Sequence, residues 1–116
     1  MIKNFLSATP FDVANCHDGE GTIQVVELFT EFASSMQYFH YTVLPPGTSV
    51  GLHKHGNDEE FYVIIEGEGL MTDEGQDKPV RAGDVIKNPP YGEHALVNTS
   101  ATQPLKMLVF EVPITA

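Results

Sequence analysis

The sequence predicts an all-β fold, a small antiparallel barrel or jelly roll that forms a single domain. Short segments rich in β-branched and aromatic residues recur along the chain. Clusters of Gly, Pro, Asn and Asp lie between these segments, and such clusters mark turns. No segment has the apolar spacing of a convincing helix. Short strands at regular intervals around a polar interior are typical of small barrels and jelly rolls.

The predicted strands follow one another with a turn signal at each boundary. They are Thr22–Phe29, Met36–Leu44, Val50–His55, Glu60–Glu66, Gly69–Asp73, Val80–Ala82, Asp84–Lys87, His94–Asn98 and Leu105–Val112. The turns include Pro45-Pro46-Gly47, Gly56-Asn57-Asp58, Gly67-Glu68-Gly69, Asp73-Glu74-Gly75, Asn88-Pro89-Pro90 and Asn98-Thr99-Ser100. The segment Glu31–Ser35 fits either a loop or a single helical turn.

Length and charge limit the possible functions. The 116 residues predict one domain, 1–116, with an N-terminal arm and strand over 1–35 and a core barrel over 36–112. Six Lys and Arg against 16 Asp and Glu give a net charge of -10 with neutral histidines. Such a charge repels phosphate backbones and anionic membrane surfaces, so we expect neither nucleic acid nor a membrane as a partner.

Cysteine content and the N-terminal residues indicate a compartment. Cys16 is the only cysteine, so no intramolecular disulfide can form, which fits a reducing environment. Met1–Leu6 holds one Lys and no long apolar stretch, unlike a secretory signal. The longest apolar runs, such as Phe61–Ile65 and Met107–Phe110, are too short to span a bilayer. We therefore expect a soluble cytoplasmic protein.

Two histidines and a glutamate are spaced so that they can meet. Residues two apart on a β-strand point to the same side, so His53 and His55 can aim both rings at one point. The turn signal at residues 56–58 then allows a neighbouring strand to bring Glu60 back towards that point. With His94 downstream, this pattern indicates a metal site with four protein ligands.

The same residues resemble a known family. Gly47, five residues, His53, one residue, His55, four residues, Glu60, six residues and Gly67 match the first signature of the cupins at every fixed position. The residues Gly83, Pro89, His94 and Asn98 are similar to the second signature. One glycine departs from it, because Gly92 lies one position later than expected. The distance from Pro89 to His94 is nevertheless preserved.

The resemblance implies a cupin jelly-roll barrel, a double-stranded β-helix, with one divalent metal ion inside. Its ligands would be His53, His55, Glu60 and His94. Three neutral imidazoles and one carboxylate leave a divalent ion with a charge of about +1 and, at octahedral coordination, roughly two open positions. This ligand set has no thiolate, so iron, manganese, nickel and catalytic zinc are all admissible.

Strand alternation ranks the residues around this metal site. If Glu60 faces the interior, then Tyr62 and Ile64 share its face, and Glu59 turns away towards solvent. Tyr62 is the best candidate for a catalytic proton donor or a hydrogen-bond partner of substrate, and a tyrosine packed in the core is the equal alternative. On the later strand, Leu96 accompanies His94.

Other polar residues have less specific interpretations. Asn98 shares the face of His94 and is expected to fix a turn, because it precedes Thr99-Ser100. His17 and His40 are read as surface or satisfied core residues. Within 36–44 the inward face is left open. Tyr38, His40 and Thr42 would give a polar pocket, whereas Phe39, Tyr41 and Val43 would give an apolar one.

The outward face of the Glu60 strand is also apolar. Phe61, Val63 and Ile65 alternate with the inward residues, so the outer side must be covered too. The strand Ile23–Phe29 is the expected cover, either from the same chain or exchanged from a second subunit. Small cupins are commonly dimers, so the resemblance favours a homodimer.

Three classes of function remain. The first is a metal-dependent enzyme that acts on a small oxygen-rich substrate, such as a sugar derivative, a hydroxy acid or an enol, as an isomerase, dioxygenase or decarboxylase. The second is a non-catalytic binding or sensing module that uses the metal as an anchor. The third, a structural barrel of storage type, predicts missing ligands, and all four are present. We therefore favour the enzyme.

Overall fold

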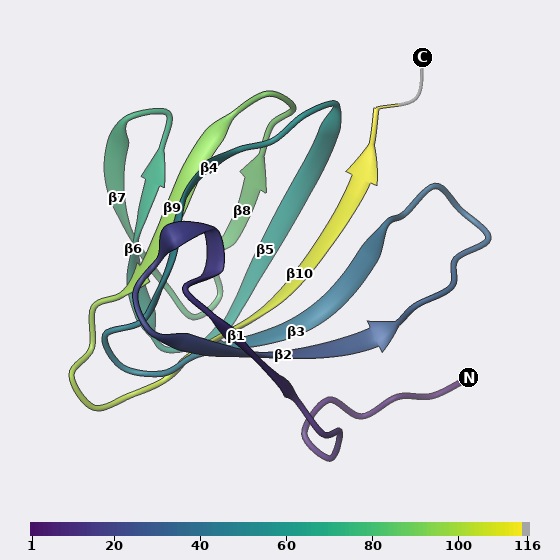
Figure 1. Cartoon of the computed structure of the whole chain (residues 1–116), viewed down its shortest axis with the longest axis horizontal. Coiled ribbons are helices and arrows are strands. Elements are labelled where there is room, and N and C mark those ends of the chain that lie inside the picture. The colour runs from purple at the N-terminus through teal and green to yellow at the C-terminus, as the bar shows by residue number, and fades with distance from the viewer. Residues whose placement is uncertain (115–116) are drawn as a thin grey trace.

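Two antiparallel sheets make up the described part of the chain, residues 1–114 of a computed structural model (Figure 1). The larger sheet runs in the order β1 (Phe11–Ala14), β2 (Thr22–Phe29), β3 (Tyr38–Leu44), β10 (Leu105–Pro113), β5 (Asp58–Glu66) and β8 (Val85–Asn88). The smaller runs in the order β4 (Ser49–Lys54), β9 (Glu93–Asn98), β6 (Glu68–Asp73) and β7 (Gln76–Arg81). A 3₁₀ turn, η1 (Cys16–Asp18), lies between β1 and β2. The predicted all-β jelly roll is confirmed.

The strands lie close to their predicted positions, with two kinds of difference. The strand β7 begins at Gln76 rather than Val80 because it is the edge of its sheet, where polar residues and Pro79 are tolerated. The strand β1 and the turn η1 were not predicted, since β1 has only four residues and one short alternation. Residues 31–35 form a loop rather than a helical turn.

The inward faces of the two sheets enclose a continuous apolar core. Its fully buried members include Leu44, Ile64, Leu96, Leu105 and Met107, each no more than 1% exposed. Because side chains alternate along a strand, the same strands carry polar residues inward at their other ends. The interior is therefore apolar at one end and polar at the other.

The inward face of β3, which the sequence left open, consists of Tyr38, His40 and Thr42. These three line an interior cavity, and Leu44 continues the same face into the core. Phe39 packs on the opposite side of the sheet. The polar alternative for this strand is thus the correct one.

The predicted cover of the outward face of β5 is wrong for the single chain. The segment Ile23–Phe29 belongs to β2, which lies in the same sheet as β5, with β3 and β10 between them. A strand cannot cover the face of its own open sheet. The N-terminal arm packs on the same side of the sheet at β3 rather than at β5, where the ring of Phe5 stacks on Tyr41 with centroids 4.3 Å apart. Ile65 stays 40% exposed.

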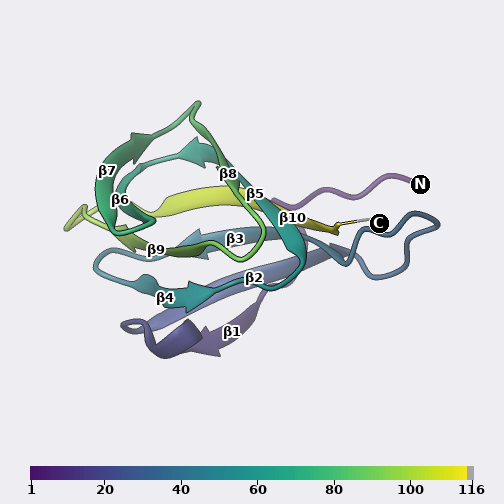
Figure 2. The same cartoon turned by 90° about the horizontal axis from the view of Figure 1, so that it is seen from above.

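The turn η1 packs against β4 and so lies beside the polar end of the interior. In Figure 2, β1 and η1 form the lower edge of the molecule, beneath β4. Within the described chain, no helix has the length and apolar character needed to span a bilayer.

Candidate metal centre

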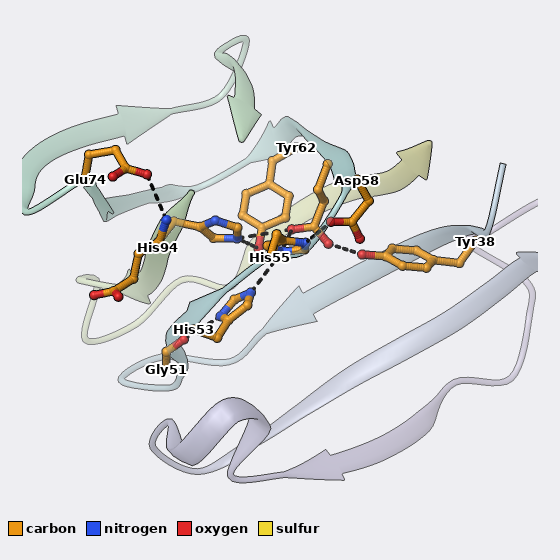
Figure 3. A network of polar contacts seen from close by, with 10 residues as sticks. Tyr38, Gly51, His53, His55, Asp58, Tyr62, Glu74 and His94 are labelled. Atoms are coloured by element: carbon orange, nitrogen blue, oxygen red, sulfur yellow. Dashed lines mark hydrogen bonds and ion pairs between the residues drawn. The ribbon is translucent and has the colours of Figure 1, made fainter. Parts of the chain in front are cut away.

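Four side chains converge at the polar end of the interior (Figure 3). They are His53, His55, Glu60 and His94, and one ligand atom from each lies within 4.8 Å of the other three. Glu60 and His94 are buried, at 5% and 1% exposure, whereas the two histidines of β4 and its end are partly buried. The four residues that the sequence selected are therefore brought together in space.

Strand register explains how distant residues meet. His53 on β4 pairs directly with His94 on β9, and a register shift between Val50 and His53 sets this pairing. Glu60 comes from β5 in the facing sheet. The short connection between β4 and β5 carries His55 at its start, so both sheets contribute to one point.

The ring orientations point the ligand atoms inward. The Nδ1 atom of His53 lies 2.8 Å from the carbonyl oxygen of Gly51, and Nδ1 of His55 lies 3.3 Å from a carboxylate oxygen of Asp58. Each acceptor favours the proton on Nδ1, which leaves Nε2 with a free lone pair. These two Nε2 atoms face each other at 3.2 Å. Two lone pairs at this distance repel each other, and either a proton on one ring or a metal ion between the rings removes the repulsion.

The spacing of the ligand atoms fits a single metal ion. Nε2 of His55 and Nε2 of His94 each lie 3.2 Å from Oε1 of Glu60. Ligands that bind an ion at about 2.1 Å and at right angles lie about 3.0 Å apart. The three observed separations are close to this value. The group could therefore hold one ion with little rearrangement.

The two oxygens of Glu60 have different partners. His55 and His94 face Oε1, whereas the hydroxyl of Tyr38 donates a hydrogen bond to Oε2. Burial alone would raise the pKa of Glu60, but hydrogen bonds from these three residues hold the pKa well below its usual range. The group is thus a carboxylate, with one oxygen free to ligate an ion.

Burial also favours the neutral, metal-binding form of one of the histidines. It lowers the pKa of His53 to about 4, so this ring is neutral at physiological pH. The pKa of His55 is raised, first by its hydrogen bond with Glu60. A neutral imidazole is the form that binds metal, so an ion that binds here displaces any proton held on His55.

A second group of possible ligands shares His55. It combines His55 with Asp58 and Glu111, again with ligand atoms within 4.8 Å of one another. This group has three members rather than four, and neither carboxylate is part of the cavity wall. The four-residue group includes His53 and Glu60, which do line the cavity, so it is the better candidate.

Tyr62 lies beside the group, as alternation predicted. Its side chain is 3% exposed, and its hydroxyl lies 3.3 Å from Nε2 of His94. Burial, followed by the charge of Glu60, raises the pKa of Tyr62 well above its ordinary value. The phenol therefore stays protonated and can donate a hydrogen bond, or give its proton to a stronger base.

The remaining predicted neighbours lie as expected. Ile64 and Leu96 are buried in the core, each 1% exposed. Asn98 fixes a turn, because its side-chain amide donates to the carbonyl oxygens of Leu44 and Gln103 while Oδ1 accepts from the backbone of Ser100. Glu59 stands outside the cluster.

A cavity of about 290 Å³ opens next to the four side chains. Its wall is apolar over most of its extent and polar near Glu60. The lining residues are Phe11, Val13, Cys16, His17, Ile23, Val25, Tyr38, His40, Thr42, Val50, His53, Glu60, Tyr62, Met107 and Val109. His17 is exposed at the surface and His40 is partly buried, as predicted, and both also line this cavity, which the sequence did not indicate. The sequence signal of a close chain crossing there was Gly51, a glycine inside a strand, together with Gly19.

Comparison with known proteins decides the family. The model of the family described as the cupin domain matches residues 40–111, more than half of the chain. The chain belongs to the cupin family. Among its relatives, a protein from Thermotoga maritima named an oxalate-binding protein is 36% identical over 104 residues, which cover 88% of this chain and 86% of the relative. An uncharacterized protein of Methanocaldococcus jannaschii is 41% identical over 71 residues, which cover 61% of this chain and 56% of that protein.

Solved cupin structures have the same fold. A crystal structure from Thermotoga maritima, described as a predicted oxalate decarboxylase, superposes with a TM-score of 0.93 at 34% identity. The match covers 98% of this chain and 100% of that one. A cupin from Shewanella frigidimarina described as RmlC-like has a TM-score of 0.76 at 17% identity, with 97% and 89% of the two chains covered. The latter shows a likeness of fold alone.

Proposed function

We propose that this cupin binds one divalent metal ion through His53, His55, Glu60 and His94 and uses it to hold a small dicarboxylate such as oxalate. The observation that carries this proposal is the convergence of four ligand atoms within 4.8 Å at the wall of a cavity. Iron, manganese, nickel and zinc all suit three imidazoles and a carboxylate.

Two features favour a chelating carboxylate as the bound molecule. A divalent ion with one carboxylate ligand keeps a charge of about +1 and roughly two open positions, which suit two oxygens of one anion. The relative named an oxalate-binding protein covers most of this chain, so its ligand is the first to test. Oxalate is also far smaller than the cavity of about 290 Å³.

The side chains around the cavity would contribute to chemistry as well as to binding. When bound, the metal supplies Lewis acidity that polarises a substrate oxygen. Tyr38 holds Oε2 of Glu60 and so keeps the carboxylate in one orientation. Tyr62 is buried, protonated and adjacent to His94, and we assign it the role of proton donor. Decarboxylation, in which a proton replaces the departing CO₂, is therefore the reaction we favour over isomerisation or dioxygenation.

The second candidate is a binding module without turnover, as the name of the same relative suggests. Titration calorimetry with oxalate, on manganese-loaded and metal-stripped protein, tests binding, and formate release tests turnover. We expect oxalate to bind only the loaded protein and formate to accumulate. Binding without formate would favour the binding module. No binding to protein loaded with any of the four metals would refute the proposed function.

We further propose that the cupin is a homodimer formed through the outward face of the larger sheet. Phe61 and Val63 on β5 are half-buried, and Ile65 is 40% exposed. On β10, Phe110 stacks on Phe61 at 5.0 Å and extends the apolar face. Apolar surface of this kind favours a partner. Sedimentation should show a dimer at micromolar concentration, and a monomer there would contradict the proposal.

A further inference from the structure

The turn that joins β1 to β2 reaches the cavity beside the candidate metal centre. His17, in η1, is exposed on the solvent side and contributes to the cavity wall. Its ring stacks on that of His53, with centroids 3.7 Å apart and planes inclined by only 9°. Figure 3 shows the turn directly beneath Gly51 and His53. His17 therefore stands at the mouth of the cavity, against one of the four proposed ligands.

The contact between this turn and β4 depends on two glycines. A Cβ atom on Gly51 would lie 2.1 Å from the carbonyl oxygen of His17, and one on Gly19 would lie 2.3 Å from the carbonyl oxygen of Ser49. Two hydrogen bonds join the crossing segments, from the Ser49 amide to the Glu20 carbonyl at 3.0 Å and from the Glu20 amide to Ser49 Oγ at 2.8 Å. The position of His17 is thus set by the backbone.

The turn also holds unfavourable backbone angles. Asn15, His17 and Asp18 have φ values of 49°, 51° and 62°, in the left-handed region that L-residues seldom occupy. Strain of this kind persists where the surrounding structure imposes it, and it gathers at functional sites. A glycine at position 17 would relieve the strain, yet the chain carries an imidazole there.

His17 is placed beside the proposed ion rather than on it. It is not one of the four residues whose ligand atoms lie within 4.8 Å of one another. A molecule held in the open positions of the ion would occupy the cavity that His17 helps to line. No Lys or Arg appears among the residues that line this cavity in the described chain, so neutral donors must meet any carboxylate oxygen that the ion does not bind.

We propose that His17 is a specificity-determining residue, whose ring N–H donates a hydrogen bond to one of the two carboxylate oxygens that a chelated dicarboxylate keeps off the metal. This inference rests on the proposed function. A monocarboxylate has no second carboxylate to meet the ring. His17 should therefore distinguish oxalate from acetate while leaving metal binding to the four ligands.

Titration calorimetry on manganese-loaded protein tests this role, with oxalate and acetate as probes and metal content as an independent readout. His17→Phe keeps an aromatic ring for the stack and removes the N–H. His17→Asn accepts the left-handed backbone and removes the ring, so it protects the test against misfolding. Asn15→Gly is the matched control, because it alters the same turn at a residue that does not line the cavity.

We expect both His17 variants to keep their metal, to bind oxalate about tenfold more weakly and to bind acetate within about twofold of the wild type. Asn15→Gly should bind oxalate like the wild type. Equal oxalate affinity in wild type and both His17 variants would overturn the inference and leave the proposed function intact. Loss of metal in both variants would also overturn it. Failure of the wild type to bind oxalate would instead refute the proposed function.

Discussion

The two ends of the barrel interior are built by the same strands and differ in chemistry. On β5, Glu60 lies at the polar end and Ile64 in the apolar core, both facing inward. On β3, Tyr38 likewise lies at the polar end and Leu44 in the apolar core. One end buries a carboxylate and several imidazoles, which costs free energy unless they are paired. The other end buries aliphatic side chains, which stabilise the fold.

This contrast separates residues that serve binding from residues that serve stability. Two histidines whose Nε2 lone pairs face each other repel and do not stabilise a core. A cation between them removes this repulsion. The apolar end has no such repulsion, because the side chains buried there carry no charged or hydrogen-bonding groups. Substitutions at the two ends should therefore have different consequences.

The largest effect is expected at the polar end, from Glu60→Gln. The amide has nearly the same shape but removes the one negative charge among the four proposed ligands. We expect metal affinity to fall by about a hundredfold or more, since truncating a buried charge partner costs about 2–5 kcal/mol. A competition titration against a chromophoric chelator measures this change. An affinity within threefold of the wild type would show that Glu60 does not bind the ion.

The apolar counterpart is Ile64→Ala, four residues further along the same strand. It should lower the free energy of unfolding by about 2–5 kcal/mol through lost burial and a cavity. Metal affinity of the folded protein should stay within about twofold of the wild type. Urea denaturation and the same chelator competition check both expectations. A metal affinity as weak as that of Glu60→Gln would erase the distinction between the two ends.

A smaller effect is expected from Tyr38→Phe. The variant removes the hydrogen bond to Oε2 of Glu60 and leaves the four proposed ligands in place. We expect metal affinity to weaken by about tenfold, the usual worth of a hydrogen bond to a charged group. Chelator competition is again the measurement, with Tyr41→Phe on the outward face of β3 as the control. Equal affinities in the two variants would show that Tyr38 does not orient Glu60.

The smallest effect is expected on the stability of the metal-free protein as the pH is lowered. Burial lowers the pKa of His53 from 6.5 to about 4, so the unfolded chain takes up a proton there before the folded protein does. His53 therefore reduces stability as the pH falls from about 6.5 to about 4. His55 acts in the opposite direction, because its raised pKa makes its protonation favour the folded state.

Urea midpoints of metal-free wild type and His53→Ala, each at pH 7 and pH 5, isolate the contribution of His53. The wild type should lose more stability on acidification than the variant. The difference is expected to be modest because the ring is only partly buried. Equal losses of stability in the two proteins would show that His53 does not cause the loss on acidification.

The sequence predicted the polar end better than its surroundings. The four candidate ligands could be found because strand alternation and turn length place His53, His55 and Glu60 together, and the second signature adds His94. The inward-facing residues of β5, Glu60, Tyr62 and Ile64, were predicted from the same alternation. For β3, alternation alone was insufficient, because tyrosines occur on both of its faces and either could have faced inward.

The contribution of the N-terminal turn could not be predicted. His17 reaches the cavity only because Gly19 and Gly51 allow two segments to cross, and their contact is a tertiary feature. The outer cover of β5 was misassigned for a similar reason. An apolar face shows that something must cover it, but the sequence does not say which segment lies in the same sheet.

The most direct test is elemental analysis of protein purified without added metal, beside a His53→Ala variant prepared in the same way. We expect about one divalent ion per chain in the wild type and a large loss in the variant, since one of three imidazole ligands is missing. Circular dichroism should confirm that the variant keeps its β structure. Unchanged metal content in a folded His53→Ala protein would contradict a centre built from these four side chains.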